Sequence, residues 1–276
     1  MKVLVMGATG GSGRAVVEAL AGRGHEVTAF ARRAGAVFGG RAGVRAADGD
    51  ATVPADVDRA VRGQDAVVVT LGISEPPLRV RLLGSAGTPL DVRSRGTAAV
   101  VAAMREHGVR RLVVQSSYGV GETRDRLPLA SRLVLALLLR PQIADHERQE
   151  RIVRDSGLDW SLVQPVYLTD GDEEAVRSAT GDAEGMRVSR RAVGAVLADL
   201  VGDPGDRGRS LAVSGARTAG ARGGRLRGRS EPARGAREDG PLSAAPLQGP
   251  AASLRVVGGR RVLLPSLRGV GRTGSS

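Results

Sequence analysis

Residues 2–13 read KVLVMGATGGSG, a short apolar run followed by glycines at positions 7, 10 and 13. The overlapping stretch 12–23 carries apolar side chains at helical spacing, namely Ala15, Val16, Ala19 and Leu20. This pattern predicts a strand, a tight turn and a helix. A glycine-rich turn in that context is typical of a dinucleotide site, because the first amides of the helix face the pyrophosphate.

The residues of the turn have distinct expected roles. Gly7 permits the tight turn, Gly10 lets the backbone approach the pyrophosphate, and Gly13 lets the helix pack on the strand. Glycine is common in plain turns too, and this chain has 40 of them. Strand, turn and helix agree in position, which favours binding. The predicted cofactor-binding residues here are Gly7, Thr9, Gly10, Gly11, Ser12 and Gly13.

The end of the second expected strand bears on the type of nucleotide. NAD-selective sites place a carboxylate there for the ribose hydroxyl, whereas this strand ends in Arg32 and Arg33. An arginine at this position favours binding of the 2′-phosphate, so Arg32 predicts that NADPH binds in preference to NADH. The alternative is that Arg32 and Arg33 are solvated loop charges. Asp50 follows the third expected strand, where it either reaches the adenine edge or caps a turn.

Apolar runs and amphipathic segments alternate along the rest of the chain. The expected strands are 2–6, 25–31, 44–47, 66–71, 111–115, 160–163 and 211–213, and the expected helices are 12–23, 55–62, 92–107, 145–156 and 190–201. Near-continuous apolar strands separated by helices indicate a parallel sheet covered on both faces. The predicted fold is an α/β, Rossmann-type doubly wound sheet, with its ligand beyond the carboxyl ends of the strands.

The positive charge is concentrated near the C-terminus. The formal net charge is +12, and residues 216–276 hold 12 Arg against three acidic residues. Gly and Pro fill 17 of these 61 positions and no aromatic residue occurs, so burial could hardly offset the entropy of ordering. We expect one domain over 1–215 and a disordered tail over 216–276. Nucleic-acid binding by this tail is disfavoured because it has no aromatic side chains on which bases could stack. A further hypothesis is that a reading-frame slip near Gly215 produced the composition of the tail.

Several classes of site are excluded or disfavoured by composition. The chain has no Cys, which excludes disulfides and thiolate metal sites, and no His, Asp and Glu pattern indicates a metal site. The longest apolar run, 133–139, is far shorter than the roughly 20 residues a membrane helix needs. The N-terminus lacks the features of a signal peptide, so a cytoplasmic protein is expected.

Several motifs together resemble those of the atypical short-chain dehydrogenases/reductases, in their NAD(P)H-binding, NmrA-like branch. The order and spacing of these motifs are also similar to those of the biliverdin-IXβ reductases, also called flavin reductases. The resemblance covers residues 2 to about 215 and is most specific over residues 145–171. The motifs are the glycine turn, Arg32, Gly49-Asp50, residues 64–68 leading to Leu71-Gly72, Ser116-Ser117, Asp145–Glu150, Ser156–Trp160 and Leu168–Gly171.

The resemblance implies positions for further site residues. It implies that Leu71, Gly72 and Ser116 lie along the cofactor and that Ser117 faces the nicotinamide. It also implies that Pro165 and its neighbours form the far wall. Tyr167 stands where the flavin reductases have a histidine. Ser117 also fits an ordinary strand-end hydroxyl that bonds the local backbone.

The chain departs from the pattern of these families at the usual catalytic pair. No Lys follows Lys2, so the Y-x-x-x-K pair is missing, and Gln142 and His146 occupy its positions. Gln164 and Val166 likewise replace an arginine and a glycine. A tyrosine needs a neighbouring cation to act as a base near pH 7, so alcohol oxidation is disfavoured. We interpret His146 as exposed in the first turn of a helix rather than as a proton shuttle.

Hydride transfer to a flavin, a quinone or another conjugated acceptor needs less help, because the developing charge is delocalised. In this hypothesis Ser117 donates a hydrogen bond near the nicotinamide, and Tyr167 or Tyr118 shapes the acceptor pocket. The alternatives are a non-catalytic NADP sensor and, least favoured, an epimerase or dehydratase acting on a nucleotide sugar. The partner is a small molecule, and the oligomeric state stays open.

Overall fold

The computed structural model of the 276-residue chain describes residues 1–73, 87–127 and 129–216. The tail expected over 216–276 therefore lies, apart from Ala216, outside the described residues. So do the side chains of the apolar run 133–139.

The described residues form an eight-stranded sheet in the order β3-β2-β1-β4-β5-β6-β10-β8. All neighbours pair in parallel except β8, which runs antiparallel to β10 at the edge. The strands are β1 (Lys2–Met6), β2 (Glu26–Ala31), β3 (Val44–Asp48), β4 (Ala66–Val69), β5 (Arg111–Gln115), β6 (Asp159–Pro165), β8 (Ala175–Ser178) and β10 (Arg209–Gly215). The prediction of a Rossmann-type sheet is confirmed, with one antiparallel edge strand added.

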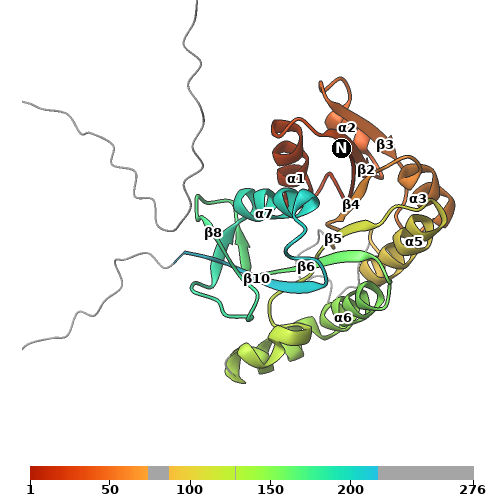
Figure 1. Ribbon diagram of the computed structural model, residues 1–276. Coiled ribbons are helices and arrows are strands. Elements are labelled where there is room, and N and C mark those ends of the chain that lie inside the picture. Colours follow the sequence, from red (N-terminus) through yellow and green to blue (C-terminus); the bar gives the residue numbers. More distant parts are fainter. Residues whose placement is uncertain (74–86, 128, 217–276) are drawn as a thin grey trace, which may run out of the picture. The chain divides into compact units, whose positions relative to one another are not determined.

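Helices cover both faces of the sheet (Figure 1). One face carries α1 (Gly11–Gly22) and α7 (Arg190–Gly202), which pack side by side. The other face carries α3 (Pro54–Val61), α5 (Val92–Glu106) and α6 (Leu129–Arg154). Short elements complete the described residues: α2 (Ala34–Phe38), a 3-10 turn (Gly121–Arg126), and a separate parallel pair, β7 (Tyr167–Thr169) with β9 (Arg187–Ser189).

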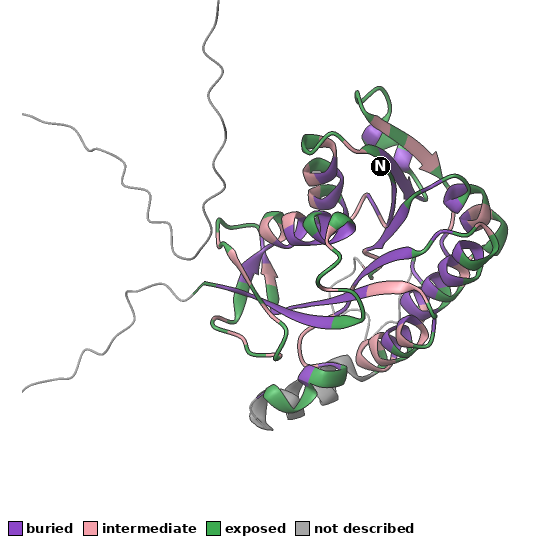
Figure 2. Ribbon diagram, in the orientation of Figure 1, coloured by how far each residue is buried: buried purple, intermediate pink, exposed green. Residues whose placement is uncertain are grey.

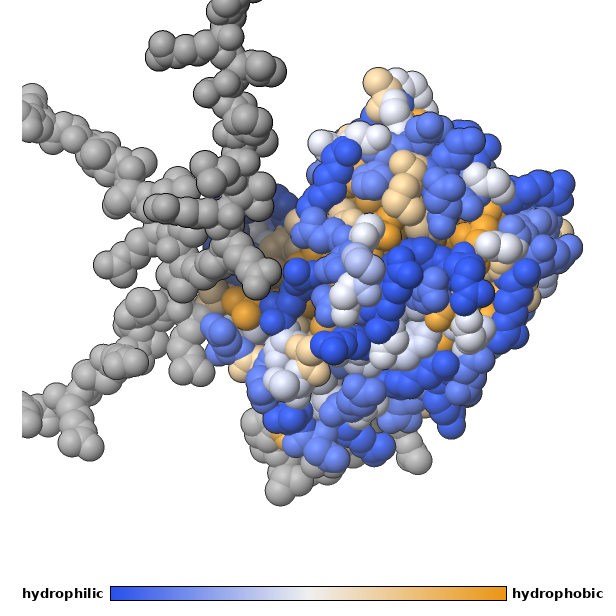
Figure 3. All heavy atoms as spheres, viewed as in Figure 1, coloured by the Kyte–Doolittle hydropathy of each residue, from blue (hydrophilic) through white to orange (hydrophobic). Residues whose placement is uncertain are grey.

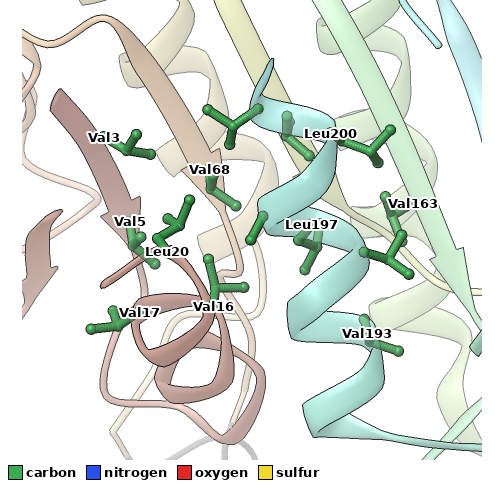
Figure 4. Close-up of a cluster of buried hydrophobic side chains, with 14 of the residues drawn as sticks. Val3, Val5, Val16, Val17, Leu20, Val68, Val163, Val193, Leu197 and Leu200 are labelled. Carbon is green, nitrogen blue, oxygen red and sulfur yellow. The ribbon is translucent and has the colours of Figure 1, made fainter. Parts of the chain in front are cut away.

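The strands supply two hydrophobic cores because successive side chains point to opposite faces. Val3 and Val5 of β1 pack with α1 and α7, where Leu197 and Leu200 meet them (Figure 4). Leu4 belongs to the other core, with α3, α5 and α6. The central strands are consequently buried on both sides (Figure 2), and this is why they read as continuous apolar runs.

Helix α6 is the largest departure from the expected elements. The sequence predicts a helix over 145–156, whereas α6 runs from Leu129 to Arg154 with Pro141 inside it. A proline inside a helix removes one backbone hydrogen bond and usually ends or kinks the helix. For this reason the sequence does not predict that the residues before Pro141 belong to the same helix as residues 145–156. The expectation that Asp145 and His146 occupy the first turn of a helix is therefore wrong.

The outer surface is mainly polar. Hydrophilic residues cover most of the face seen in Figure 3, and apolar residues lie there in small separate areas. Across the described residues, no helix combines the length and the apolar character needed to cross a bilayer.

Candidate functional site

The glycine turn connects β1 to α1 at the carboxyl edge of the sheet. Gly7 has φ +80°, a conformation that favours glycine, and its amide donates to the carbonyl oxygen of Phe30 at 3.0 Å. The amide of Gly10 donates back to the carbonyl of Gly7 at 3.1 Å. The turn is thereby fixed against the end of β2.

Gly13 lies where the first turn of α1 crosses this loop. A Cβ atom at Gly13 would stand 2.8 Å from Cα of Ala8 and closer still to the carbonyl oxygen of Gly7. Both neighbours are backbone, so they cannot give way as a flexible side chain would. Only glycine fits here with the loop unchanged.

The start of α1 suits an anion. Gly10 is the N-cap and makes no side-chain cap hydrogen bond, and the first turn contains no acidic residue. The helix amides and dipole therefore favour negative charge at this point. Ser12 is buried in the same turn, and the carbonyl of Thr9 accepts from Nε of Arg14 at 3.0 Å. These residues fit a bound pyrophosphate, held by the turn and the amides of the helix.

Arg190 closes one side of the turn, which the sequence did not indicate. A Cβ atom at Gly11 would stand 2.7 Å from Cδ of Arg190, so the arginine stem lies directly over that glycine. Its guanidinium pairs with Asp170 at 2.6 Å. Arg190 reads in the sequence only as the first residue of a helix.

Arg32 and Asp50 flank the ends of β2 and β3. The guanidinium of Arg32 donates to the carbonyl of Gly87, and its Nη2 to Oγ1 of Thr88 at 3.2 Å. Oδ1 of Asp50 accepts from the amide and the hydroxyl of Thr52 at 2.8 and 2.7 Å, and these hydrogen bonds lower the pKa of Asp50. These hydrogen bonds cap the turn that follows β3, which is one of the two roles expected for Asp50.

The end of β4 lies next to β1, so Leu71 and Gly72 stand beside the glycine turn. A Cβ atom at Gly7 would lie 2.9 Å from the carbonyl oxygen of Thr70 and 3.2 Å from the amide nitrogen of Leu71. Gly72 faces Arg93 of α5, whose Nη2 would lie 3.4 Å from a Cβ atom at Gly72. Leu71 thus lies against the glycine turn and Gly72 follows it, and their contact with the cofactor stays a prediction.

Ser116 follows β5 and belongs to a buried polar cluster. Its hydroxyl donates to Oε1 of Glu150 at 2.6 Å, and Nε2 of Gln164 donates to the same oxygen at 2.8 Å. The other carboxylate oxygen of Glu150 pairs with Arg154 at 3.0 Å. The cluster ties β5, β6 and α6 together behind the site, and it occupies the Ser116 hydroxyl and Gln164.

A small pocket of about 90 Å³ opens beside Ser117. Its lining comes from the segment after β5 and from α6: Ser117, Tyr118, Gly119, Val120, Gln142, Ile143 and His146. Gln142 and His146, four residues apart, thus share one helix face with the pocket. The hydroxyl of Ser117 donates to the carbonyl of Tyr118 at 3.3 Å, a long bond that leaves it able to turn towards a ligand.

His146 is half-buried in this pocket, not exposed as its sequence context suggested. Burial, together with the nearby positive charge of Arg93, lowers its pKa to about 3. Its Nδ1 lies 3.4 Å from the hydroxyl oxygen of Ser116. The imidazole is therefore neutral at physiological pH, where it can donate or accept a hydrogen bond without carrying charge.

The two tyrosines lie in different environments. Tyr118 lines the pocket, its hydroxyl donates to the carbonyl of Gly181 at 3.2 Å, and burial raises its pKa. Tyr167 is 70% exposed, with the guanidinium carbon of Arg187 at 5.9 Å from its ring centroid. Pro165 ends β6 and accepts a hydrogen bond from the amide of Tyr118 at 2.9 Å, which places it behind the pocket wall.

Among the described residues, no group of three or more His, Asp and Glu side chains is placed to hold a metal ion. Sequence reasoning also missed several buried charges, among them Glu150 and Arg93 near the pocket. Glu150 reads as part of a polar helix and Arg93 as one of many arginines. No local signal in the sequence distinguishes either from a solvated residue.

The glycine turn and the sheet order define a Rossmann-type nucleotide-binding protein, and comparison with known proteins gives the family. The NAD(P)H-binding family matches residues 7–204. The chain belongs to this family of NAD(P)H-binding proteins.

Three relatives illustrate the similarity. A (4-alkanoyl-5-oxo-2,5-dihydrofuran-3-yl)methyl phosphate reductase of Streptomyces griseus is 34% identical over 222 residues, 77% of this chain and 67% of the relative. A Rossmann-fold NAD(P)-binding family protein from Shigella flexneri is 26% identical, with TM-score 0.57 over 78% of this chain and 93% of that one. ChuY, an anaerobilin reductase from Escherichia coli, shares the fold at 22% identity, with TM-score 0.63 over 78% and 97% of the chains.

Proposed function

We propose that this protein transfers hydride from NADPH to a planar, conjugated, electron-poor acceptor such as a flavin or a quinone. The coarser conclusion, an NAD(P)H-dependent reductase, follows from the family and from the reductase relative. The preference for NADPH and the class of acceptor are the proposal. The observation that supports it is the lining of the pocket, where Ser117, Tyr118 and a neutral His146 meet. At about 90 Å³ the pocket takes the edge of a conjugated ring system rather than the whole of it.

The acid–base groups that line the pocket favour this class of acceptor. Burial raises the pKa of Tyr118 and lowers that of His146 to about 3, so neither is a strong base near pH 7. Oxidation of an alcohol needs such a base to remove the hydroxyl proton. Reduction of a conjugated acceptor spreads the new charge over its π-system, so positioning supplies most of the rate enhancement.

The reductase relative supports the same class. Its name places an oxo group and an alkanoyl group on a dihydrofuran ring, and carbonyl groups conjugated with a ring double bond make an electron-poor system. The likeness covers 77% of this chain.

Each residue has one task in this proposal. When bound, the reduced nicotinamide supplies the hydride, and solvent supplies the proton that completes the two-electron reduction. Ser117 holds a donor hydroxyl at the pocket wall, next to the expected nicotinamide. Tyr118, held by its bond to Gly181, forms a wall against which a planar acceptor lies. Tyr167 stands outside this lining, and we assign it a minor role.

A non-catalytic sensor of NADP is the second candidate. The observation that favours it is the replacement of the usual Tyr and Lys by Gln142 and His146, which line the pocket without supplying a base or a cation. The sensor and the reductase share the cofactor and differ in turnover.

Cofactor titration followed by a turnover assay separates the two candidates. The full chain is titrated with NADPH and NADH by nucleotide fluorescence, and NADPH oxidation is then followed at 340 nm with FMN and with a quinone. The reductase requires tight NADPH binding and sustained oxidation. Binding without oxidation of any acceptor supports the sensor, and absence of binding contradicts both.

The two tyrosines provide a matched test of the pocket. Tyr118→Ala is expected to raise KM for FMN about three- to tenfold, the size of an aromatic stacking contact. Tyr167→Ala, at the 70% exposed tyrosine, is expected to change KM less than about twofold. Steady-state kinetics at saturating NADPH measure both. An effect of Tyr167→Ala as large as that of Tyr118→Ala would give the acceptor contact to Tyr167 instead.

Arg32 decides the choice of nucleotide in this proposal. Arg32→Ser is expected to raise the Kd of NADPH about 10- to 100-fold, the value of charge-assisted bonds to one phosphate, and to leave the Kd of NADH unchanged. Arg33→Ser is the control, because Arg33 is the exposed neighbour at the start of α2. Equal loss of both nucleotides in Arg32→Ser would assign Arg32 a structural role through Gly87 and Thr88.

A further inference from the structure

Arg93 is a buried cation with unsatisfied hydrogen-bond donors. It lies in the first turn of α5, and its side chain is 11% exposed. Among the residues the structure describes, its Nε and Nη1 find no acceptor. Buried polar groups are almost always hydrogen-bonded, and a charged donor is the most unfavourable kind to leave open. Two open donors on a buried guanidinium therefore indicate a ligand.

The nearby carboxylate does not satisfy these donors. Oδ2 of Asp145 lies 3.9 Å from Nη1 of the Arg93 guanidinium, which is longer than a hydrogen bond. The oxygens of Asp145 already accept from the amides of Arg93 and Ser94 at 3.1 and 3.2 Å and from the Ser94 hydroxyl at 2.5 Å. Asp145 thus caps α5 and balances the charge of Arg93, while the planar fork of the guanidinium stays open.

Arg93 is not one of the residues that line the pocket, but it lies next to two elements of the site. Its Nη2 would lie 3.4 Å from a Cβ atom at Gly72, after β4, and its charge acts on His146, which lines the pocket with Ser117. The two phosphate positions expected for NADPH lie elsewhere, at the start of α1 and beyond β2. Arg93 thus lies near the pocket and away from both.

We propose that Arg93 binds an anionic group, a carboxylate or a phosphate, of the acceptor that enters the pocket beside Ser117. The inference rests on the proposed function and refines it to acceptors that combine a conjugated ring with an anionic substituent. An arginine fork suits such groups because it offers parallel N–H donors to two oxygens. Asp145, which keeps Arg93 from being an isolated buried charge, is a positioning residue.

A pair of acceptors that differ only in an anion tests this site. FMN and riboflavin share the isoalloxazine ring and differ in one phosphate. In Arg93→Met, kcat/KM for FMN is expected to fall about tenfold or more, mainly through KM. The value for riboflavin and the Kd of NADPH are expected to change less than about twofold. Arg95→Met is the matched control, since Arg95 lies on the same helix with its side chain 55% exposed.

The outcomes that overturn the site are distinct from those that overturn the function. Equal loss with both flavins would make Arg93 structural, and a loss confined to NADPH affinity would assign it to a cofactor phosphate. If the wild type reduces neither the flavins nor a quinone, the function fails. Whenever flavin turnover is absent, the site is judged by flavin fluorescence titration of the NADP⁺ complex. FMN must then bind more tightly than riboflavin, and Arg93→Met must remove the difference. Arg93→Lys, which keeps the charge and loses the fork, gives the same comparison if the Met variant does not fold.

Discussion

Gly13→Ala is expected to weaken NADPH binding more than about 100-fold and to lower the free energy of unfolding by about 3 kcal/mol. The added Cβ atom would stand 2.8 Å from Cα of Ala8 and nearer to the carbonyl oxygen of Gly7. Relief requires α1 to move away from the turn or Gly7 to leave its conformation at φ +80°. Either movement displaces the amides that are expected to hold the pyrophosphate.

Gly22→Ala provides the matched control, because Gly22 is the last residue of the same helix. Nothing lies within 4 Å of a Cβ atom at Gly22, so alanine is expected to stabilise the protein slightly, by up to about 1 kcal/mol. Urea unfolding and NADPH titration of both variants make the comparison. Wild-type affinity in Gly13→Ala would mean that the cofactor does not use this turn.

The features predicted correctly from the sequence are those that depend on residues close together in the chain. The glycine turn needs only β1, three glycines and the start of α1, and all lie within residues 2–22. The buried strands follow from their apolar runs, since a strand covered on both faces has no polar side to show. Parallel pairing then follows from the helices between the strands, and it fixes which strand ends share an edge.

The surroundings of the pocket were not predictable in the same way, because they depend on contacts across long stretches of chain. Glu150 is buried only because α6 brings it against Ser116 and Gln164. Locally it belongs to the polar segment DHERQE, which reads as a solvated helix. The same segment places Asp145 under α5 and His146 beside Ser117. A helix whose sequence is polar on every face can therefore be buried on one side when neighbouring elements supply hydrogen-bond partners for its side chains.

His146 provides the second large effect, a loss of stability in mild acid. The pKa of an unfolded histidine is about 6.5, and burial together with the charge of Arg93 lowers that of His146 to about 3. Between these values the unfolded chain binds one more proton than the folded chain at this site. Stability therefore falls as the pH falls below 6.5, by about 1.4 kcal/mol per pH unit, until the folded pKa is reached.

From pH 7 to pH 5 the expected loss of unfolding free energy from this residue is about 2 kcal/mol. That value changes little for any folded pKa below about 4, because His146 then stays neutral in the folded chain at pH 5. His146→Gln keeps an uncharged polar group and should remove this part of the decrease. Urea unfolding of both proteins at pH 7, 6 and 5 measures it. The loss belongs to His146 only if it is about 2 kcal/mol larger in the wild type than in the variant.

A neutral His146 also has a consequence for turnover. If imidazolium formation were part of the reaction, the rate of NADPH oxidation would show a titration near pH 6.5, the ordinary value for histidine. With the pKa near 3, the rate should show no such step between pH 5.5 and 8. A step near pH 6.5 that disappears in His146→Gln would mean that His146 carries a proton during turnover, and it would restore the proton shuttle in place of a neutral hydrogen-bonding group.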